Sequence, residues 1–100
     1  MKGLDDAQAA AQEAREEAGV MGSIWSEPIG CYEYLKQEGR EYDLCEVRVY
    51  PLEVETQLDN WLEKGQRDCR WFSADDALRL VDDPGLKKII STASALIRQA

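Results

Sequence analysis

The 100-residue sequence predicts one small α+β domain, spanning residues 1–100, with helices near both ends and strands between them. Three observations lead to this fold class. A well-capped, alanine-rich helix is expected within residues 5–19. Two segments of alternating polarity, 29–36 and 42–50, flank a glycine-containing turn. Two further helices with capping residues of their own follow residue 72.

The first helix is marked at both ends. Asp5 is the expected N-cap, and Gln8 completes a capping-box pattern with it. Gly19 is placed to end the helix in a left-handed conformation. Alanines at helical spacing form one narrow apolar stripe, which allows close packing. The stripe consists of Ala7, Ala10, Ala11, Ala14 and Ala18.

Three glutamates share a second face of this helix. Glu13, Glu16 and Glu17 stand at i, i+3 and i+4, where like charges repel by roughly 0.2–0.5 kcal/mol per pair. The last two also fall in the final turn, where the helix dipole disfavours anions. Carboxylates clustered where their charges are unfavourable indicate a bound cation, and their oxygen atoms suit Mg²⁺, Mn²⁺ or Ca²⁺. A solvated acidic face is the alternative interpretation.

Strands are predicted in the middle of the chain. Residues 21–27 form a short strand that Pro28 interrupts. Residues 29–36 and 42–50 form two strands joined by a hairpin connection that contains Gly39.

The segment after Pro51 is less regular. Residues 52–54 are expected to continue the preceding strand in shifted phase, because a proline cannot donate to the ladder. The apolar spacing of residues 58–62 permits a short helical turn, and residues 69–72 are expected to form a brief strand.

The last third predicts two helices in succession. Ser73 with Asp76 forms a capping pattern for a helix that runs to about Val81. Asp83 is placed to cap the next helix, with Pro84 at its first position. The final helix carries one apolar stripe, formed by Leu86, Ile89, Ile90, Ala93, Leu96 and Ile97.

The composition of the chain excludes several classes of function. The net charge of −8 argues against binding a nucleic-acid polymer or an anionic membrane, and no apolar run is long enough to span a bilayer. The absence of histidine excludes catalysis by a histidine base. Cys31, Cys45 and Cys69 lack metal-site spacing, so we expect reduced thiols and a cytoplasmic location.

The segment AAAQEAREEAGV, residues 9–20, resembles the second half of the Nudix box, G-x5-E-x7-R-E-U-x-E-E-x-G-U, with U aliphatic. Glu13, Glu16 and Glu17 fall on its glutamates, and Gly19 on its last glycine. Gln12 replaces the arginine. Further likeness to the diphosphoinositol-polyphosphate and diadenosine-polyphosphate hydrolase-like group lies in PIGCYEYLK, in Leu58-Asp59-Asn60-Trp61, and in Arg70-Trp71-Phe72-Ser73 with Asp76-Ala77.

This resemblance implies a Nudix-like mixed sheet packed between helices, and a metal-dependent hydrolase of diphosphate linkages in a small phosphorylated substrate, nucleoside- or inositol-linked. It implies Mg²⁺, or Mn²⁺, held by Glu16 and Glu17, with Glu13 as a further ligand or as the base. The candidate phosphate contacts are Lys2, Arg48, Arg67 and Arg70, with solvated surface charges as the alternative. Trp25, Trp61 and Trp71 are expected in the core, with base stacking by one of them as the alternative.

The N-terminal half of the Nudix box is not matched in full. Leu4 stands where the first glutamate of the box belongs, and the leading glycine would fall before Met1. We therefore expect a Nudix domain that lacks its N-terminal strands, with impaired activity and exposed sheet edges that favour a homodimer. A non-catalytic binding module, or an inert fragment, is the alternative function.

Overall fold

The computed structural model of the chain describes residues 5–99, and it confirms the α+β class. Its contacts divide these residues into two compact units, which are described separately. The helix unit contains residues 5–28 and 50–71, and the hairpin unit contains residues 29–49 and 72–99. No helix in the described part of the chain is long and apolar enough to cross a membrane.

The helix unit begins with α1 (Asp6–Ala18), whose two ends form as expected. The Asp5 carboxylate accepts from the backbone N–H of Gln8 at 2.7 Å, and the Gln8 side chain accepts from the N–H of Asp5 at 3.2 Å. This reciprocal capping box satisfies two helix donors that would otherwise lack a partner. Within the alanine stripe, Ala7 is buried.

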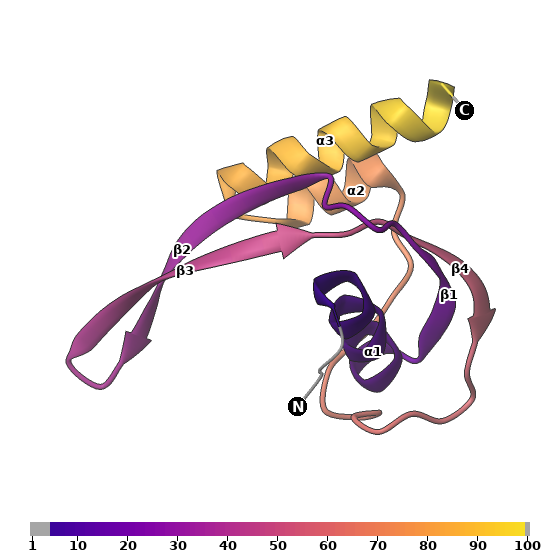
Figure 1. The fold of residues 1–100 in the computed structure, drawn as a ribbon, viewed down its shortest axis with the longest axis horizontal. Helices are drawn as coiled ribbons and strands as arrows, with labels where there is room; N and C mark the ends of the chain where they lie inside the picture. The colour runs from indigo at the N-terminus through magenta and orange to yellow at the C-terminus, as the bar shows by residue number, and fades with distance from the viewer. Residues whose placement is uncertain (1–4, 100) are drawn as a thin grey trace. The chain divides into compact units, whose positions relative to one another are not determined.

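Helix α1 packs beside an antiparallel strand pair, β1 (Val20–Ile24) and β4 (Leu52–Gln57) (Figure 1). The expectation that residues 52–54 continue the preceding strand was wrong. Pro51 has no N–H to donate, and its carbonyl instead accepts from the N–H of Trp25 at 3.0 Å. The chain therefore leaves one strand pair at Pro51 and enters the other.

Two further expectations for the helix unit were wrong. Residues 58–62 form no helix, and residues 69–72 form no strand. The segment after β4 is a chain of turns, with some of its polar groups bonded within the segment and others to the C-terminal end of α1. We call residues 58–69 the closing loop.

The hairpin unit is built on β2 (Gly30–Glu38) and β3 (Glu41–Val49), which pair in unbroken antiparallel register. Their two-residue connection begins at Gly39, whose positive φ of 62° suits a tight hairpin turn. Helix α3 packs on β2, and the turn end of the hairpin extends past the helices of this unit (Figure 1). The named strands of residues 5–99 form two separate two-stranded sheets, both antiparallel, and no parallel strand pair of a mixed sheet is present among them.

The helices of the hairpin unit are α2 (Ala74–Leu80) and α3 (Pro84–Gln99), and both capping predictions are confirmed. The Ser73 hydroxyl accepts from the N–H of Asp76 at 3.1 Å. The Asp83 carboxylate accepts from the N–H groups of Gly85 and Leu86. Ile89 of the predicted stripe is buried against Gly30 of β2, while the side chain of Ile97 lies outside the described residues.

Gly19 ends α1 in the left-handed region, with φ 68°, as its place in the sequence predicts. It is also pressed against an aromatic ring. A Cβ at this position would lie 2.2 Å from Cε3 of Trp61. The residue is therefore required to be glycine both by backbone conformation and by packing.

We expect Gly19→Ala to lower the free energy of unfolding through both effects. The left-handed backbone costs about 1–2 kcal/mol, and overpacking against Trp61 adds about 1–3 kcal/mol. Gly65→Ala is the matched control, since Gly65 also has a positive φ but open space around its Cα. Urea unfolding of both variants tests this, and equal losses would contradict a packing role for Gly19.

Candidate active site

Helix α1 carries all three of the predicted site glutamates. Glu13 is exposed, whereas Glu16 and Glu17 are partly buried in the last turn. The capping box at one end and Gly19 at the other set the length and the phase of the helix. The side-chain periodicity of the helix then places the three carboxylates on neighbouring positions of one face.

Two of these carboxylates have partners within the described residues. The Gln12 side-chain amide donates to Oε2 of Glu16 at 3.0 Å. The Arg67 guanidinium Nη2 lies 3.0 Å from Oε1 of Glu17. Glu13 has no ion-pair or hydrogen-bond partner in residues 5–99. Gln12 and Arg67 therefore engage the two partly buried members of the set.

The last turn of α1 is held by the closing loop and by the end of β4. The Glu16 carbonyl accepts from the N–H of Glu63 at 2.9 Å, and the Gly19 carbonyl accepts from the N–H of Leu58 at 2.8 Å. The Gln57 side chain donates to the same Gly19 carbonyl at 3.0 Å. These bonds satisfy carbonyl groups that a helix end leaves without partners. They fix the position of the turn that carries Glu16 and Glu17.

Trp61 is the aromatic residue at this junction. Its ring packs on Gly19, the Lys64 ammonium lies 5.2 Å from the ring centroid, and the indole Nε1 is buried without a partner in the described residues. Trp61 is partly buried, so the prediction of core packing holds for it in part. The prediction was wrong for Trp25 and Trp71, which are 47% and 71% exposed.

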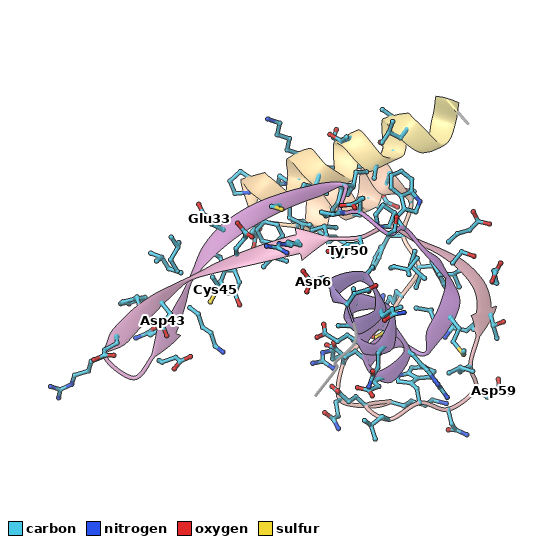
Figure 2. The ribbon with its side chains drawn as sticks, viewed as in Figure 1. Asp6, Glu33, Asp43, Cys45, Tyr50 and Asp59 are labelled. Carbon is cyan, nitrogen blue, oxygen red and sulfur yellow. The ribbon has the colours of Figure 1, made fainter. Side chains whose placement is uncertain are left out.

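Trp61 also lines two clefts of the helix unit. The first, of about 620 Å³, lies between α1, the β1–β4 pair and the closing loop, and Glu16 reaches its wall. The second, of about 570 Å³, is lined by Lys64, Arg70 and Trp71 as well as by the strands. Asp59, at the start of the closing loop, also lines the second cleft (Figure 2). Trp61 is therefore part of the wall of both clefts.

The structure brings the predicted phosphate contacts together only in part. Arg67 pairs with Glu17 and with Glu63, both through its guanidinium. Arg70 lies in the same unit and pairs with Asp68 at 3.4 Å. Arg48 belongs to the hairpin unit, on β3, and lies 3.2 Å from Glu46. Lys2 lies outside the described residues.

Arg67 is cationic at any working pH. Its hydrogen bond to Glu63 raises the pKa of the guanidinium most; desolvation lowers this pKa, and the charges of Glu17 and Glu63 raise it further. The cation therefore remains beside the α1 carboxylates whenever these are ionised.

The three glutamates are suitable ligands for a divalent cation, but their side chains are not arranged around a common point. Carboxylate oxygens are the ligands that Mg²⁺ and Mn²⁺ prefer. In the described residues, however, no three His, Cys, Asp or Glu side chains converge closely enough to hold a metal. Glu16 and Glu17 are instead paired with Gln12 and Arg67.

Sequence reasoning missed the residues that hold the end of α1. Gln57, Glu63 and Cys69 all bond to its last turn, the Cys69 thiol at 3.7 Å from the Glu17 carbonyl. A weak signal existed in the i,i+4 spacing of Glu63 and Arg67, which do pair. Because the segment has no regular pattern, nothing in the sequence predicts that it lies against the helix.

Comparison with known proteins shows the family of this chain. Residues 2–93 match the family model of the NUDIX domain, so the chain belongs to the NUDIX family. This one model spans residues of both the helix unit and the hairpin unit.

The chain is also similar to curated proteins of Arabidopsis thaliana. It is 37% identical over 79 residues to "Nudix hydrolase 13, mitochondrial", in an alignment that covers 73% of the chain and 39% of that protein. It is 34% identical over 77 residues to "Nudix hydrolase 12, mitochondrial", covering 73% and 38%. With "Nudix hydrolase 16, mitochondrial" the identity is 33% over 84 residues, covering 80% and 46%. The chain thus spans less than half of these relatives, and no solved structure matches it significantly.

Proposed function

We propose that the chain carries the carboxylate part of a metal-dependent site that hydrolyses diphosphate linkages. The observation that supports this most is the placement of Glu16 and Glu17 in the fixed last turn of α1, with Glu16 at the wall of a cleft. The names of the similar Arabidopsis proteins identify those proteins as Nudix hydrolases. The proposed substrate is a small molecule with a nucleoside- or inositol-linked diphosphate.

Glu13, Glu16 and Glu17 would hold Mg²⁺ or Mn²⁺, and one of them would serve as the base for water. When bound, such a cation lowers the pKa of a coordinated water and polarises a phosphoryl oxygen. Lys64 and Arg70, which line the second cleft, are the nearest basic side chains available to a substrate phosphate there. Local cations are needed because the chain's net charge of −8 repels anions.

The location proposed for this activity is the cytoplasm. The thiols of Cys31 and Cys69 are exposed and Cys45 is partly buried, and all three are free. Exposed free thiols persist most readily in reducing compartments.

The activity test measures phosphate release with Mg²⁺ on diadenosine polyphosphates, nucleoside-diphosphate sugars and diphosphoinositol substrates. We expect Mg²⁺-dependent release that Glu17→Gln lowers at least about tenfold, since the variant loses a charged ligand. Glu33→Gln is the matched control, with the same charge change on β2 of the hairpin unit (Figure 2). Absence of release from all three substrates would favour a non-catalytic binding module instead.

Metal binding gives a separate prediction. Mg²⁺ or Mn²⁺ at about ten times its Kd should raise Tm by about 6–11 °C, because a ligand that binds only the folded state stabilises it. Glu17→Gln should remove most of the increase, and Glu33→Gln should preserve it. A Tm that does not respond to metal in the folded wild-type chain would contradict the site.

We also propose that the chain forms a homodimer through the hairpin. Leu35 of β2 and Leu44 of β3 are directly opposite in the register, and each side chain is 65% exposed. The two strands pair only with each other among the described residues, so each keeps one edge for another chain. An exposed cross-strand leucine pair beside free edges is typical of an association surface.

Analytical ultracentrifugation tests this assembly. We expect the wild-type chain to sediment as a dimer and Leu44→Lys to weaken association at least about tenfold, because a charge would enter the apolar contact. Asp43→Lys on the same strand is the control, since successive strand residues point to opposite faces (Figure 2). A wild-type monomer at all concentrations would rule the dimer out.

A further inference from the structure

The second cleft of the helix unit has a wall that differs from the glutamate face of α1. Its volume of about 570 Å³ is typical of small-molecule sites. The strands β1 and β4 supply apolar side chains to it, among them Val20, Leu52 and Val54. The three glutamates of α1 are not among its described lining residues. A ligand can therefore occupy this cleft without contact with those carboxylates.

The aromatic part of this wall is Trp61 and Trp71, which differ in how much ring surface they offer. The Trp61 ring packs on Gly19, and the Lys64 ammonium lies 5.2 Å from its centroid. Trp71 is 71% exposed. Aromatic rings attract one another in offset or edge-to-face arrangements. The Trp71 ring is therefore the available surface against which a second flat ring can pack.

The charged residues of the described wall have a positive sum. Lys64 and Arg70 line the cleft, and Asp59 is the acidic residue that lines it with them (Figure 2). Arg70 has Asp68 as a partner at 3.4 Å, but both side chains lie in solvent, which makes this ion pair weak. In a chain with a net charge of −8, such a local excess of cations attracts an anion.

We infer that the second cleft is a binding site for a planar aromatic anion, with its ring against Trp71 and its anionic group beside Lys64 and Arg70. Neither the α1 glutamates nor a metal ion takes part, so this site goes beyond the proposed hydrolysis. A polyol phosphate would use the two cations but would leave Trp71 in water. The wall therefore favours an aromatic anion over an aliphatic one.

The experiment titrates the full chain with naphthyl phosphate in EDTA and follows the indole N–H signals by NMR. Trp71→Leu and Trp25→Leu assign the signals, because each variant loses one of them. We expect the largest change at Trp71 and little change at Trp25, which is not among the described lining residues of either cleft. Equal changes at Trp25 and Trp71 would mean non-specific adsorption and would overturn the inference.

Two further ligands separate the ring from the charge. Naphthol keeps the ring and lacks the phosphate, and cyclohexyl phosphate keeps the phosphate and lacks the aromatic ring. Each should bind about fivefold or more weakly than naphthyl phosphate, because each lacks one of the two interactions. Equal binding of naphthol would overturn the role of the cations, and equal binding of cyclohexyl phosphate would overturn the role of Trp71.

Variants of the wall test the same two interactions by calorimetry in EDTA. Trp71→Leu should raise the Kd about fivefold or more, and Trp25→Leu, at another exposed tryptophan, should leave it unchanged. Arg70→Gln should raise the Kd about two- to fivefold. Its control is Arg79→Gln, with the same charge change at an arginine that pairs with Asp76 in α2. Equal effects of the two arginine variants would reduce the result to net charge and overturn the site.

Asp59 gives a prediction of the opposite sign. Asp59→Asn should lower the Kd about twofold, because it removes a like charge from the wall that holds the anion. Asp43→Asn on β3 is the control with the same charge change in the hairpin unit (Figure 2). A higher Kd for Asp59→Asn would contradict an anion in this cleft. Circular dichroism confirms that each variant is folded.

The outcomes separate this site from the proposed function. If naphthyl phosphate binds in EDTA and no diphosphate substrate is hydrolysed, the cleft stands and the hydrolase fails. If hydrolysis depends on Glu17 but no indole signal moves at up to about 5 mM ligand, where a Kd of about 1 mM would give a mostly filled site, the hydrolase stands and the cleft fails. Binding that appears only after Mg²⁺ is added would also overturn the inference.

Discussion

The arrangement of the helix unit depends on how the C-terminal end of α1 satisfies its carbonyl groups. A helix leaves its last four carbonyls without partners inside the helix. Here the Arg15 carbonyl accepts from the N–H of Gly19, and the three that follow accept from Glu63, Cys69 and Gln57. These last three donors lie about 40 or more residues further along the chain. This one helix end therefore organises the closing loop.

This attachment also makes the position of the glutamates tolerable. Glu16 and Glu17 add negative charge to a helix end that already carries a partial negative charge. The donors of the closing loop and the Arg67 guanidinium supply positive charge to the same place. A glutamate pair that is unfavourable in an isolated helix is therefore compatible with a folded protein. The same donors hold the pair in a defined position, which a site for a metal and a substrate requires.

Gly19 and Trp61 show how closely the loop approaches. The ring lies where a side chain at residue 19 would be, and this contact brings the loop within hydrogen-bonding distance of the helix end. Trp61 also lines both clefts of the helix unit. The residue that packs on the end of α1 is consequently also part of the wall of these clefts.

The sequence by itself determined the local features of this protein. The Asp5–Gln8 box, the glycine that ends α1 and the caps at Ser73 and Asp83 all involve residues within a few positions of one another. Short-range hydrogen bonds and a glycine at positive φ need no knowledge of the rest of the chain. The hairpin between β2 and β3 belongs to the same group, because its turn fixes its register. The glutamate spacing on α1 was equally visible, since helix periodicity alone sets it.

Only the tertiary structure decided which distant groups meet. Residues 58–62 have helical spacing, yet they form no helix, and the N–H groups of Leu58 and Glu63 donate to the carbonyls of Gly19 and Glu16 at the end of α1. Leu52–Gln57 pairs with β1 instead of extending β3, a choice between two partners that alternating polarity does not encode. Arg67 pairs with Glu17 and Glu63 because the loop carries it to the end of the helix. The sequence shows which residues are charged, but the path of the backbone determines which of them form ion pairs.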